Sequence, residues 1–263
     1  MNIAGTTVLL TGATGGLGQA LARRLAGAGA RVVLSGRRGD VLDELASEIG
    51  GEVAPADLSD AQSVRELATA HADADILVSN AGLSASGAIE SWTEDQIDRA
   101  LDVNLRSPII LARMLVPEMV QRGCGHLVFM SSLAGKSPTA GASLYNATKF
   151  GLRGFAGGLR AELHGTGVGV SAIFPGFIRD AGMFHETGAK LPFGVGTKSP
   201  EQVADATLRA IARNKAEVDV APLGLRVGSV LGGFVPDIAA AVTRRTGGAE
   251  IAAAHESAHM SKR

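Results

Sequence analysis

Residues 7–18 read "TVLLTGATGGLG", a short apolar run followed by a cluster of glycines. The run suits a β-strand that is buried on both faces. Glycines allow a tight turn and a close approach of the backbone to a ligand, and a helix beginning near Leu17 would direct its first N–H groups at an anion. The stretch therefore predicts a strand, a phosphate-binding turn and a helix, which together favour a dinucleotide site.

Apolar runs of the same kind recur along the chain, at 31–34, 75–79, 126–130 and 168–174. Apolar residues spaced three and four apart predict helices at 17–28, 41–49, 61–71, 94–121 and 143–163. Side-chain caps are expected at three helix starts, formed by Ser59 with Gln62, Thr93 with Gln96 and Ser199 with Gln202. Strands that alternate with helices indicate one parallel sheet with helices on both faces. We expect one domain over residues 1–245 and a tail over 246–263.

Composition limits the classes of protein to which the chain can belong. Its 263 residues are 46% hydrophobic and 19% charged, which fits a folded globular protein. A formal net charge of -1 provides no basic field to attract nucleic acid, so we predict no nucleic-acid partner. The single cysteine, Cys124, excludes an internal disulfide and a multi-cysteine metal site, and we predict no metal.

The longest apolar region, residues 227–242, is interrupted by Pro236 and Asp237. It is shorter than the roughly 20 residues that a membrane-spanning helix needs, so we predict no membrane span. The first residues lack the basic and apolar parts of a signal peptide. We therefore predict a cytoplasmic protein.

The end of the second predicted strand indicates which dinucleotide would bind. A carboxylate at this point usually binds the ribose 2′-hydroxyl of NAD, whereas arginine binds the 2′-phosphate of NADP. Here Gly36 is followed by Arg37 and Arg38, and two guanidinium groups can hold a phosphate. We therefore predict NADP(H) in preference to NAD(H); the alternative is a solvated basic turn.

Tyr145, the only tyrosine of the chain, lies four residues before Lys149 in a predicted helix. Residues at this spacing share one face of a helix. An ammonium group close to a phenol favours the phenolate and lowers the phenol's pKa from about 10. The pair would then transfer a proton near neutral pH, although the spacing by itself is common among surface residues.

Other motifs accompany this pair, in a fixed order. They are Thr11, Gly12, Gly16 and Gly18 in the glycine turn, then Asp57, then Asn80, Ala81 and Gly82, then Asn104, then Ser132 thirteen residues before Tyr145, and finally Pro175 and Gly176. Over roughly residues 4–220 the chain resembles the short-chain dehydrogenase/reductase family. This resemblance implies a single-domain, Rossmann-like α/β fold with a doubly wound parallel sheet of about seven strands and helices on both faces.

The resemblance also implies a reaction, the reversible transfer of hydride between a nicotinamide and a carbonyl or secondary alcohol carbon. Tyr145 would donate the proton, Ser132 would bind the carbonyl oxygen, Lys149 would bind the nicotinamide ribose, and Asn104 would hold a water of a proton relay. Ser131 is the alternative to Ser132. The residues expected at the cofactor are Gly12, Thr14, Gly16, Leu17, Gly18, Arg37, Arg38, Asp57, Leu58, Asn80, Ala81, Gly82, Tyr145, Lys149, Pro175, Gly176 and Ile178.

A lid is expected at about 177–198, after the sixth strand, where the loop would cover the ligand crevice. Its apolar side chains favour a lipophilic small-molecule carbonyl or alcohol, unless they only pack the lid on the body: Phe177, Ile178, Met183, Phe184, Leu191 and Phe193. His185 and Arg179 are weaker candidates for contact with a polar group of the substrate. Asp180 occupies the position at which the family often has threonine.

Small residues are frequent on the predicted helix of Tyr145, at Ala147, Gly151, Gly154, Gly157, Gly158 and Ala161. Interior glycine destabilises a helix, so their number suggests that another backbone packs closely there. In the family this helix often meets its symmetry mate, and we therefore predict a homodimer or homotetramer.

Two other functions compete with an oxidoreductase. A non-catalytic NADP(H)-binding regulator would have no need to keep Asn104, Ser132, Tyr145 and Lys149 together. A sugar-nucleotide epimerase would need a longer chain with a separate substrate region. The sequence does not indicate the substrate, the direction or the stereochemistry.

Overall fold

Seven parallel strands form one sheet in the computed structural model, which describes residues 1–139, 141–181 and 196–234. The strands lie in the order β3-β2-β1-β4-β5-β6-β7, and the order reverses between β1 and β4. Their bounds are β1 Thr7–Thr11, β2 Arg31–Ser35, β3 Glu52–Val53, β4 Ile76–Ser79, β5 Gly125–Met130, β6 Val168–Pro175 and β7 Glu217–Val220. The doubly wound parallel sheet predicted from the sequence is confirmed.

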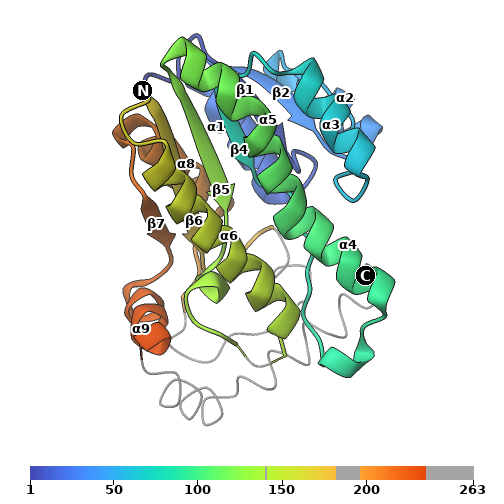
Figure 1. Ribbon diagram of the computed structural model, residues 1–263, viewed down its shortest axis with the longest axis vertical. Coiled ribbons are helices and arrows are strands. Elements are labelled where there is room, and N and C mark those ends of the chain that lie inside the picture. Colours follow the sequence, from blue (N-terminus) through green and yellow to red (C-terminus); the bar gives the residue numbers. More distant parts are fainter. Residues whose placement is uncertain (140, 182–195, 235–263) are drawn as a thin grey trace.

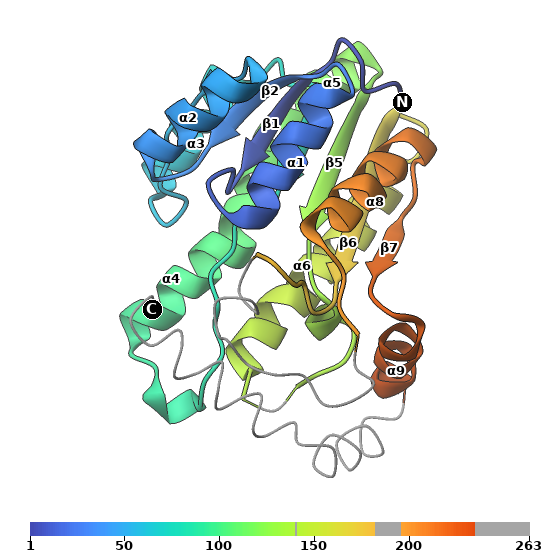
Figure 2. The same ribbon diagram turned by 180° about the vertical axis from the view of Figure 1, so that it is seen from behind.

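Helices cover both faces of this sheet (Figures 1 and 2). They are α1 Gly16–Gly27, α2 Gly39–Ile49, α3 Ala61–Ala70, α4 Glu94–Leu101, α5 Ser107–Arg122, α6 Ser143–Glu162, α8 Pro200–Arg213 and α9 Leu223–Phe234. Buried side chains of α1, α2 and α8 share one core, and those of α3, α5 and α6 share the other. Both faces of the sheet are therefore removed from water.

Alternate residues of each strand enter the two cores. In β1, Leu9 packs in the core of α3, α5 and α6, whereas Val8 and Leu10 pack in the core of α1, α2 and α8. All three side chains are fully buried. A strand covered on both sides needs an apolar residue at every position, which explains the continuous apolar runs of the sequence.

The two edge strands, β3 and β7, do not stand out as apolar runs. β3 has only two residues, and β7 reads "EVDV" with its first residue exposed. An edge strand contacts one neighbour only and tolerates polar residues, so an apolar pattern does not mark it.

Two of the three predicted capping boxes are confirmed, at Thr93 before α4 and at Ser199 before α8. The third is wrong because Asp60 caps α3, its carboxylate accepting a hydrogen bond from the N–H of Gln62. Ser59 instead donates its hydroxyl to Asp57.

The predicted helix 94–121 is divided in the structure. A π-helical segment, η2 Asp102–Arg106, separates α4 from α5. Such segments widen a helix locally and often occur at functional sites. Two short 3₁₀ turns, η1 Ile89–Ser91 and η3 Leu133–Gly135, complete the elements that surround the carboxyl edge of the sheet.

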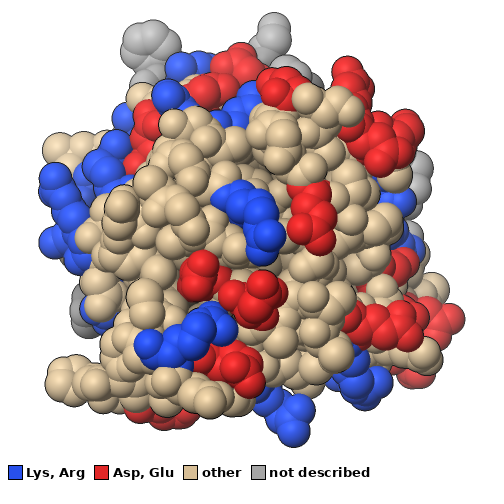
Figure 3. All heavy atoms as spheres, turned by 90° about the horizontal axis from the view of Figure 1, so that it is seen from above, with Lys and Arg blue, Asp and Glu red and all other residues tan. Residues whose placement is uncertain are grey.

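The predicted boundary at residue 245, the tail 246–263 and most of the lid lie outside the described residues. In the described ranges no helix is long and apolar enough to cross a bilayer. Acidic and basic side chains are interspersed on the face seen in Figure 3, so this face has no extended patch of one charge.

His126, in β5, provides a test of how this core responds to pH. Its Nε2 lies 2.9 Å from the hydroxyl of Ser171, which donates its proton to the carbonyl of Lys215 at 2.5 Å. Nε2 must therefore be the protonated nitrogen of a neutral ring. Burial lowers the pKa of His126 to about 4, and the positive charges of the N-terminus and Arg160 act in the same direction.

Replacing His126 should weaken the pH dependence of stability. An unfolded histidine binds a proton below its ordinary pKa of 6.5, whereas the folded one does so only near 4. The stability that the neutral His126 contributes is therefore complete above pH 6.5 and is lost as the pH falls from 6.5 to about 4. Between pH near 7 and near 5 the wild type should lose about 2 kcal/mol more than His126→Gln, which keeps an N–H donor for Ser171. Urea unfolding at both pH values measures this, and equal losses would refute it.

Candidate active site

The turns that follow β1 and β4 touch where the strand order reverses. The hydroxyl of Thr11 accepts hydrogen bonds from the N–H groups of Asn80 and Ala81, both at 3.2 Å. The Asn80 amide donates to the carbonyls of Thr11 and Gly12, also at 3.2 Å. Gly12 has a φ of +67°, and a Cβ there would lie 2.7 Å from the Cα of Ala81. Only glycine fits at this contact.

The N-terminus of α1 opens beside this contact. The helix begins at Gly16, and its N-cap Gly15 offers no side chain to the first N–H groups. A Cβ on Gly18 would overlap the carbonyl of Gly12, so this residue also has to be glycine. Unpaired N–H groups and the helix dipole attract an anion. The turn that contains Thr14, Gly16, Leu17 and Gly18 therefore fits a pyrophosphate.

Two arginines follow β2 beside the glycine turn. Arg37 and Arg38 are both exposed. The guanidinium of Arg38 donates to the carbonyl of Thr14, and the side chain of Thr14 also packs on Gly36. The structure therefore brings the predicted 2′-phosphate residues to the edge of the predicted pyrophosphate site.

Asp57 lies on the same side of the site. Its carboxylate accepts hydrogen bonds from the N–H and the hydroxyl of Ser59, at 2.9 and 2.7 Å. Burial acts to raise the pKa of Asp57, but these hydrogen bonds and the charges of Arg37 and Arg99 outweigh it, so the pKa lies below its ordinary value. The next residue, Leu58, is buried in the core with α3 and α5.

The predicted catalytic residues meet at the carboxyl ends of β5 and β6. Tyr145 lies in the first turn of α6, and Lys149 follows one turn later. Ser132, two residues beyond β5, lies beside the phenol of Tyr145 and acts to lower its pKa. Its neighbour Ser131 turns the other way and donates to the carbonyl of Lys149 at 3.1 Å. Of the two serines, Ser132 is thus the one that faces the phenol.

Tyr145 corrects the expectation about its acidity. Burial raises the pKa of the phenol to about 12, and the nearby side chain of Ser132 offsets this rise only in part. Lys149 does not have the predicted effect, because its Nζ is 5.5 Å from the centroid of the tyrosine ring and donates instead to the carbonyl of Met130 at 2.9 Å. The phenol is therefore neutral near pH 7.

Lys149 is also strongly affected by its surroundings. It is 3% exposed, and burial lowers its pKa to about 8. An ammonium group has three donors, of which the contact with Met130 uses one. The amine is therefore mostly charged near neutral pH and has donors left for a ligand.

Asn104 lies in the π-helical segment η2 and holds the loop that follows β4. Its Oδ1 accepts from the N–H of Leu83 at 2.6 Å, and its Nδ2 donates to the carbonyl of Leu83 at 3.0 Å. Nδ2 also lies 3.4 Å from the hydroxyl of Thr148, which donates to the carbonyl of Tyr145. Sequence reasoning missed Thr148, since a hydroxyl inside a helix carries no signal of such a role.

The remaining predicted residues enclose the site from the side of β6. Gly176 follows the strand, and a Cβ there would lie 2.9 Å from the Cβ of Ala221. Ile178 is 8% exposed and forms a parallel bridge with Lys198. Asp180 has a φ of 66° and is paired with Arg179 at 3.2 Å. The lid candidates Met183, Phe184, His185, Leu191 and Phe193 lie outside the described residues.

Residues 1–139, 141–181 and 196–234 contain no group of three or more histidine, cysteine, aspartate or glutamate side chains that could hold a metal ion.

Comparison with known proteins identifies the same family. A family model described as short chain dehydrogenase matches residues 6–192. Ketoacyl reductase HetN from Nostoc sp. is 35% identical over 83% of this chain and 79% of its own length. NADP-dependent 3-hydroxy acid dehydrogenase YdfG from Salmonella typhi is 37% identical over 65% of this chain and 72% of its own length.

A solved structure agrees with these relatives. The short-chain dehydrogenase from Sphingobium yanoikuyae in complex with NADPH has a TM-score of 0.76 and 28% identity, and the match covers 89% of this chain and 95% of that one. The glycine turn, the Tyr145–Lys149 helix and these matches lead to one conclusion. The chain belongs to the short-chain dehydrogenase/reductase family and is an NAD(P)-dependent oxidoreductase that acts on CH–OH or C=O groups.

Proposed function

We propose that the chain reduces a lipophilic carbonyl compound with NADPH, or oxidises the corresponding secondary alcohol with NADP⁺, and that Tyr145 transfers the proton. The observation that carries the proposal is the pair formed by Ser132, just beyond β5, and the phenol of Tyr145 on α6. It lies at the same edge of the sheet as a glycine turn that fits a pyrophosphate. The nicotinamide, when bound, supplies or takes up the hydride.

Two hydroxyl groups act on the carbonyl oxygen in the proposed reaction. Tyr145, with a pKa of about 12, is in the neutral form that donates a proton in the reducing direction. Ser132 donates a hydrogen bond to the same oxygen and stabilises the negative charge that develops on it. In the oxidising direction the phenol has to lose its proton first, so oxidation should become faster as the pH rises.

Lys149 and Asn104 support this transfer. The charged amine of Lys149 would bind the hydroxyls of the nicotinamide ribose with the donors that Met130 leaves free. Asn104 would hold a water that connects Lys149 to solvent. The side-chain amide of Asn104 already contacts Leu83 and Thr148. The water would therefore bind a lone pair of the amide oxygen that these contacts leave free.

Substituting Tyr145 should separate catalysis from cofactor binding. Tyr145→Phe keeps the ring but removes the proton donor, so kcat for carbonyl reduction should fall by about 10²-fold or more. Affinity for NADPH, measured by fluorescence titration, should fall far less than kcat, because Tyr145 is only one of the residues expected at the cofactor. A panel of ketones, aldehydes and secondary alcohols, assayed with both nicotinamide cofactors, supplies the substrate.

Ser132→Ala and Ser131→Ala form a matched pair of controls. The first should lower kcat, whereas the second should mainly lower the melting temperature, because Ser131 holds the backbone of α6. Undiminished turnover by Tyr145→Phe would overturn the mechanism. Failure of the wild type to turn over any member of the panel would favour a non-catalytic NADP(H)-binding regulator.

The preference for NADP(H) rests on Arg37 and Arg38. Both are exposed beside the glycine turn, and the charge of Arg37 acts on Asp57. One relative is named as NADP-dependent, and one similar structure contains NADPH. These facts support the proposal that the guanidinium groups of Arg37 and Arg38 bind the 2′-phosphate of NADP(H).

Removing Arg37 should weaken NADPH selectively. A charged hydrogen bond contributes about 1.5 to 3 kcal/mol, so Arg37→Ala should raise the Kd of NADPH by about tenfold or more and leave that of NADH nearly unchanged. Arg31→Ala, at the opposite end of β2, removes an equal charge and is the control. Equal losses for both cofactors would refute the assignment. Arg38 is less suitable, because its substitution also releases the turn at Thr14.

A lipophilic substrate and a homo-oligomer complete the proposal. The lid sequence favours the first, and a cytoplasmic location remains a prediction from the sequence. On α6, Gly154, Gly157 and Gly158 are exposed, and an added Cβ would meet nothing within 4 Å at any of them. Gly151 differs, because a Cβ there would lie 3.1 Å from Leu105 of the same chain. The three open glycines leave room for a second copy of α6.

A charge on this surface should dissociate the oligomer. Gly154→Glu should convert a dimer or tetramer to monomer at micromolar concentration, as measured by light scattering, because an unpaired carboxylate would be buried between copies. Gly27→Glu, at the end of α1, is a matched control, since its Cβ also meets nothing within 4 Å. A wild type that is already monomeric would contradict the prediction.

A further inference from the structure

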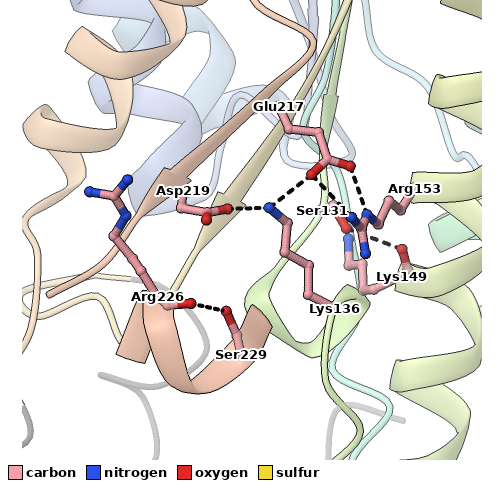
Figure 4. Close-up of polar contacts among 8 residues, drawn as sticks. All are labelled: Ser131, Lys136, Lys149, Arg153, Glu217, Asp219, Arg226 and Ser229. Carbon is pink, nitrogen blue, oxygen red and sulfur yellow. Dashed lines mark hydrogen bonds and ion pairs between the residues drawn. The ribbon is translucent and has the colours of Figure 1, made fainter. Parts of the chain in front are cut away.

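Lys136 is a buried cation just beyond the catalytic serine. It is 6% exposed, and its Nζ lies 2.6 Å from Oδ1 of Asp219 and 2.9 Å from Oε2 of Glu217 (Figure 4). Both carboxylates belong to β7, the last strand of the sheet. The ammonium also lies 4.1 Å from the centroid of the Phe174 ring, which is fully buried in β6. The amine is therefore held by ion pairs and by a cation–π contact.

Arg153 joins this group from α6. Its Nε and Nη2 bind the two oxygens of Glu217 at 2.7 and 3.2 Å (Figure 4). Burial acts to raise the pKa of Glu217, but the hydrogen bonds and charges of Arg153 and Lys136 outweigh it, so the carboxylate is ionised near neutral pH. The cluster of Lys136, Arg153, Glu217 and Asp219 thus contains two cations and two anions in balance.

The cluster connects the two segments that carry the proposed catalytic groups. Lys136 lies four residues after Ser132, at the end of the η3 turn, and Arg153 lies four residues after Lys149 on α6. Since Glu217 binds both cations, one carboxylate of β7 links the serine turn to the helix that carries the phenol.

The two segments also touch directly, without room for adjustment. A Cβ on Gly135 would lie 2.6 Å from the carbonyl oxygen of Lys149. Inside the turn, Ala134 donates to the hydroxyl of Ser132 at 3.2 Å and Gly135 donates to its carbonyl at 2.8 Å. A small rotation of the turn would therefore move the Ser132 hydroxyl away from Tyr145.

We propose that Lys136 is a positioning residue, which holds the Ser132 hydroxyl against the Tyr145 phenol by anchoring the η3 turn to Asp219 and Glu217. This inference rests on the proposed function for its catalytic consequence. Lys136 itself touches neither the substrate nor the cofactor in this role. Its effect on the reaction passes through Ser132.

Amide exchange tests the anchoring without any substrate. Lys136→Met removes the charge and retains much of the apolar stem, so the amides of Ala134, Gly135 and Lys136 in the η3 turn should exchange at least about tenfold faster. The matched control is Arg160→Met, which removes a cation of α6 that binds the carbonyl of Val170 and Asn214. It should leave exchange in the η3 turn unchanged within about twofold.

Kinetics then test whether anchoring matters for the reaction. Lys136→Met should lower kcat for the carbonyl substrate by about tenfold and leave the KM for NADPH within about threefold. Combined with Ser132→Ala, it should lower kcat by less than about twofold further, because the hydroxyl that it positions is already absent. If Lys136 only stabilised the fold, its substitution would lower activity by the same factor with and without Ser132→Ala.

A second variant is available if Lys136→Met does not fold, since it leaves the carboxylates of Asp219 and Glu217 without the ammonium that pairs with them. Lys136→Met with Asp219→Asn removes a cation and an anion together, and Glu217 keeps its contact with Arg153. Unchanged exchange in the η3 turn, or faster exchange with an unchanged kcat, would overturn the proposal, as would additive losses with Ser132→Ala. If the wild type turned over no substrate, the proposed function would fail, and the exchange measurement would still decide whether Lys136 anchors the turn.

Discussion

The contact between the turns after β1 and β4 is the constraint on which the site depends. Neighbouring parallel strands end at the same edge of the sheet, and here the two turns approach until the backbone of Ala81 occupies the place of a Cβ on Gly12. Two residues beyond Ala81, hydrogen bonds lead from Leu83 toward α6, the helix that carries Tyr145. Leu83 is held by Asn104, Asn104 lies beside Thr148, and Thr148 binds the carbonyl of Tyr145. The cofactor turn and the phenol are thus placed by one connected set of contacts.

Burial acts on the ionisable groups of this protein with a sign that depends on their charge. It raises the pKa of the Tyr145 phenol to about 12 and lowers the pKa of the Lys149 amine to about 8, because in both cases it disfavours the charged form. Near neutral pH the Tyr145 phenol is therefore neutral, and the Lys149 amine beside it is mostly protonated. At the opposite end of β5 the same effect keeps the His126 ring neutral. The low dielectric of the core therefore shifts each pKa toward the neutral form of the group, and partners such as Ser132 oppose that shift in part.

Sequence patterns predicted much of the fold, because its strands are buried on both faces. Continuous apolar runs marked the inner strands, and glycines marked the turn after β1, whose backbone meets that of the turn after β4. The patterns were least informative where an element has a single neighbour, as in β3 and β7, and inside the helix 94–121, where a π-helical segment has no signature in the spacing of apolar residues. Asp60 replaced Ser59 as the cap of α3, a choice between neighbouring residues that depends on local backbone geometry.

By itself, the sequence determined most of the alternation of strands and helices, the glycine turn and the candidate groups for proton transfer. These are local properties, set by the spacing and chemistry of residues close together in the chain. Only the tertiary structure decided that Ser132 faces Tyr145 while Ser131 faces the helix backbone, that Lys149 binds Met130, and that the phenol is a weaker acid than its spacing from Lys149 suggests. These depend on the direction of side chains and on the exclusion of water. Both arise when β5, β6 and α6 pack together, and neither can be read from positions along the chain.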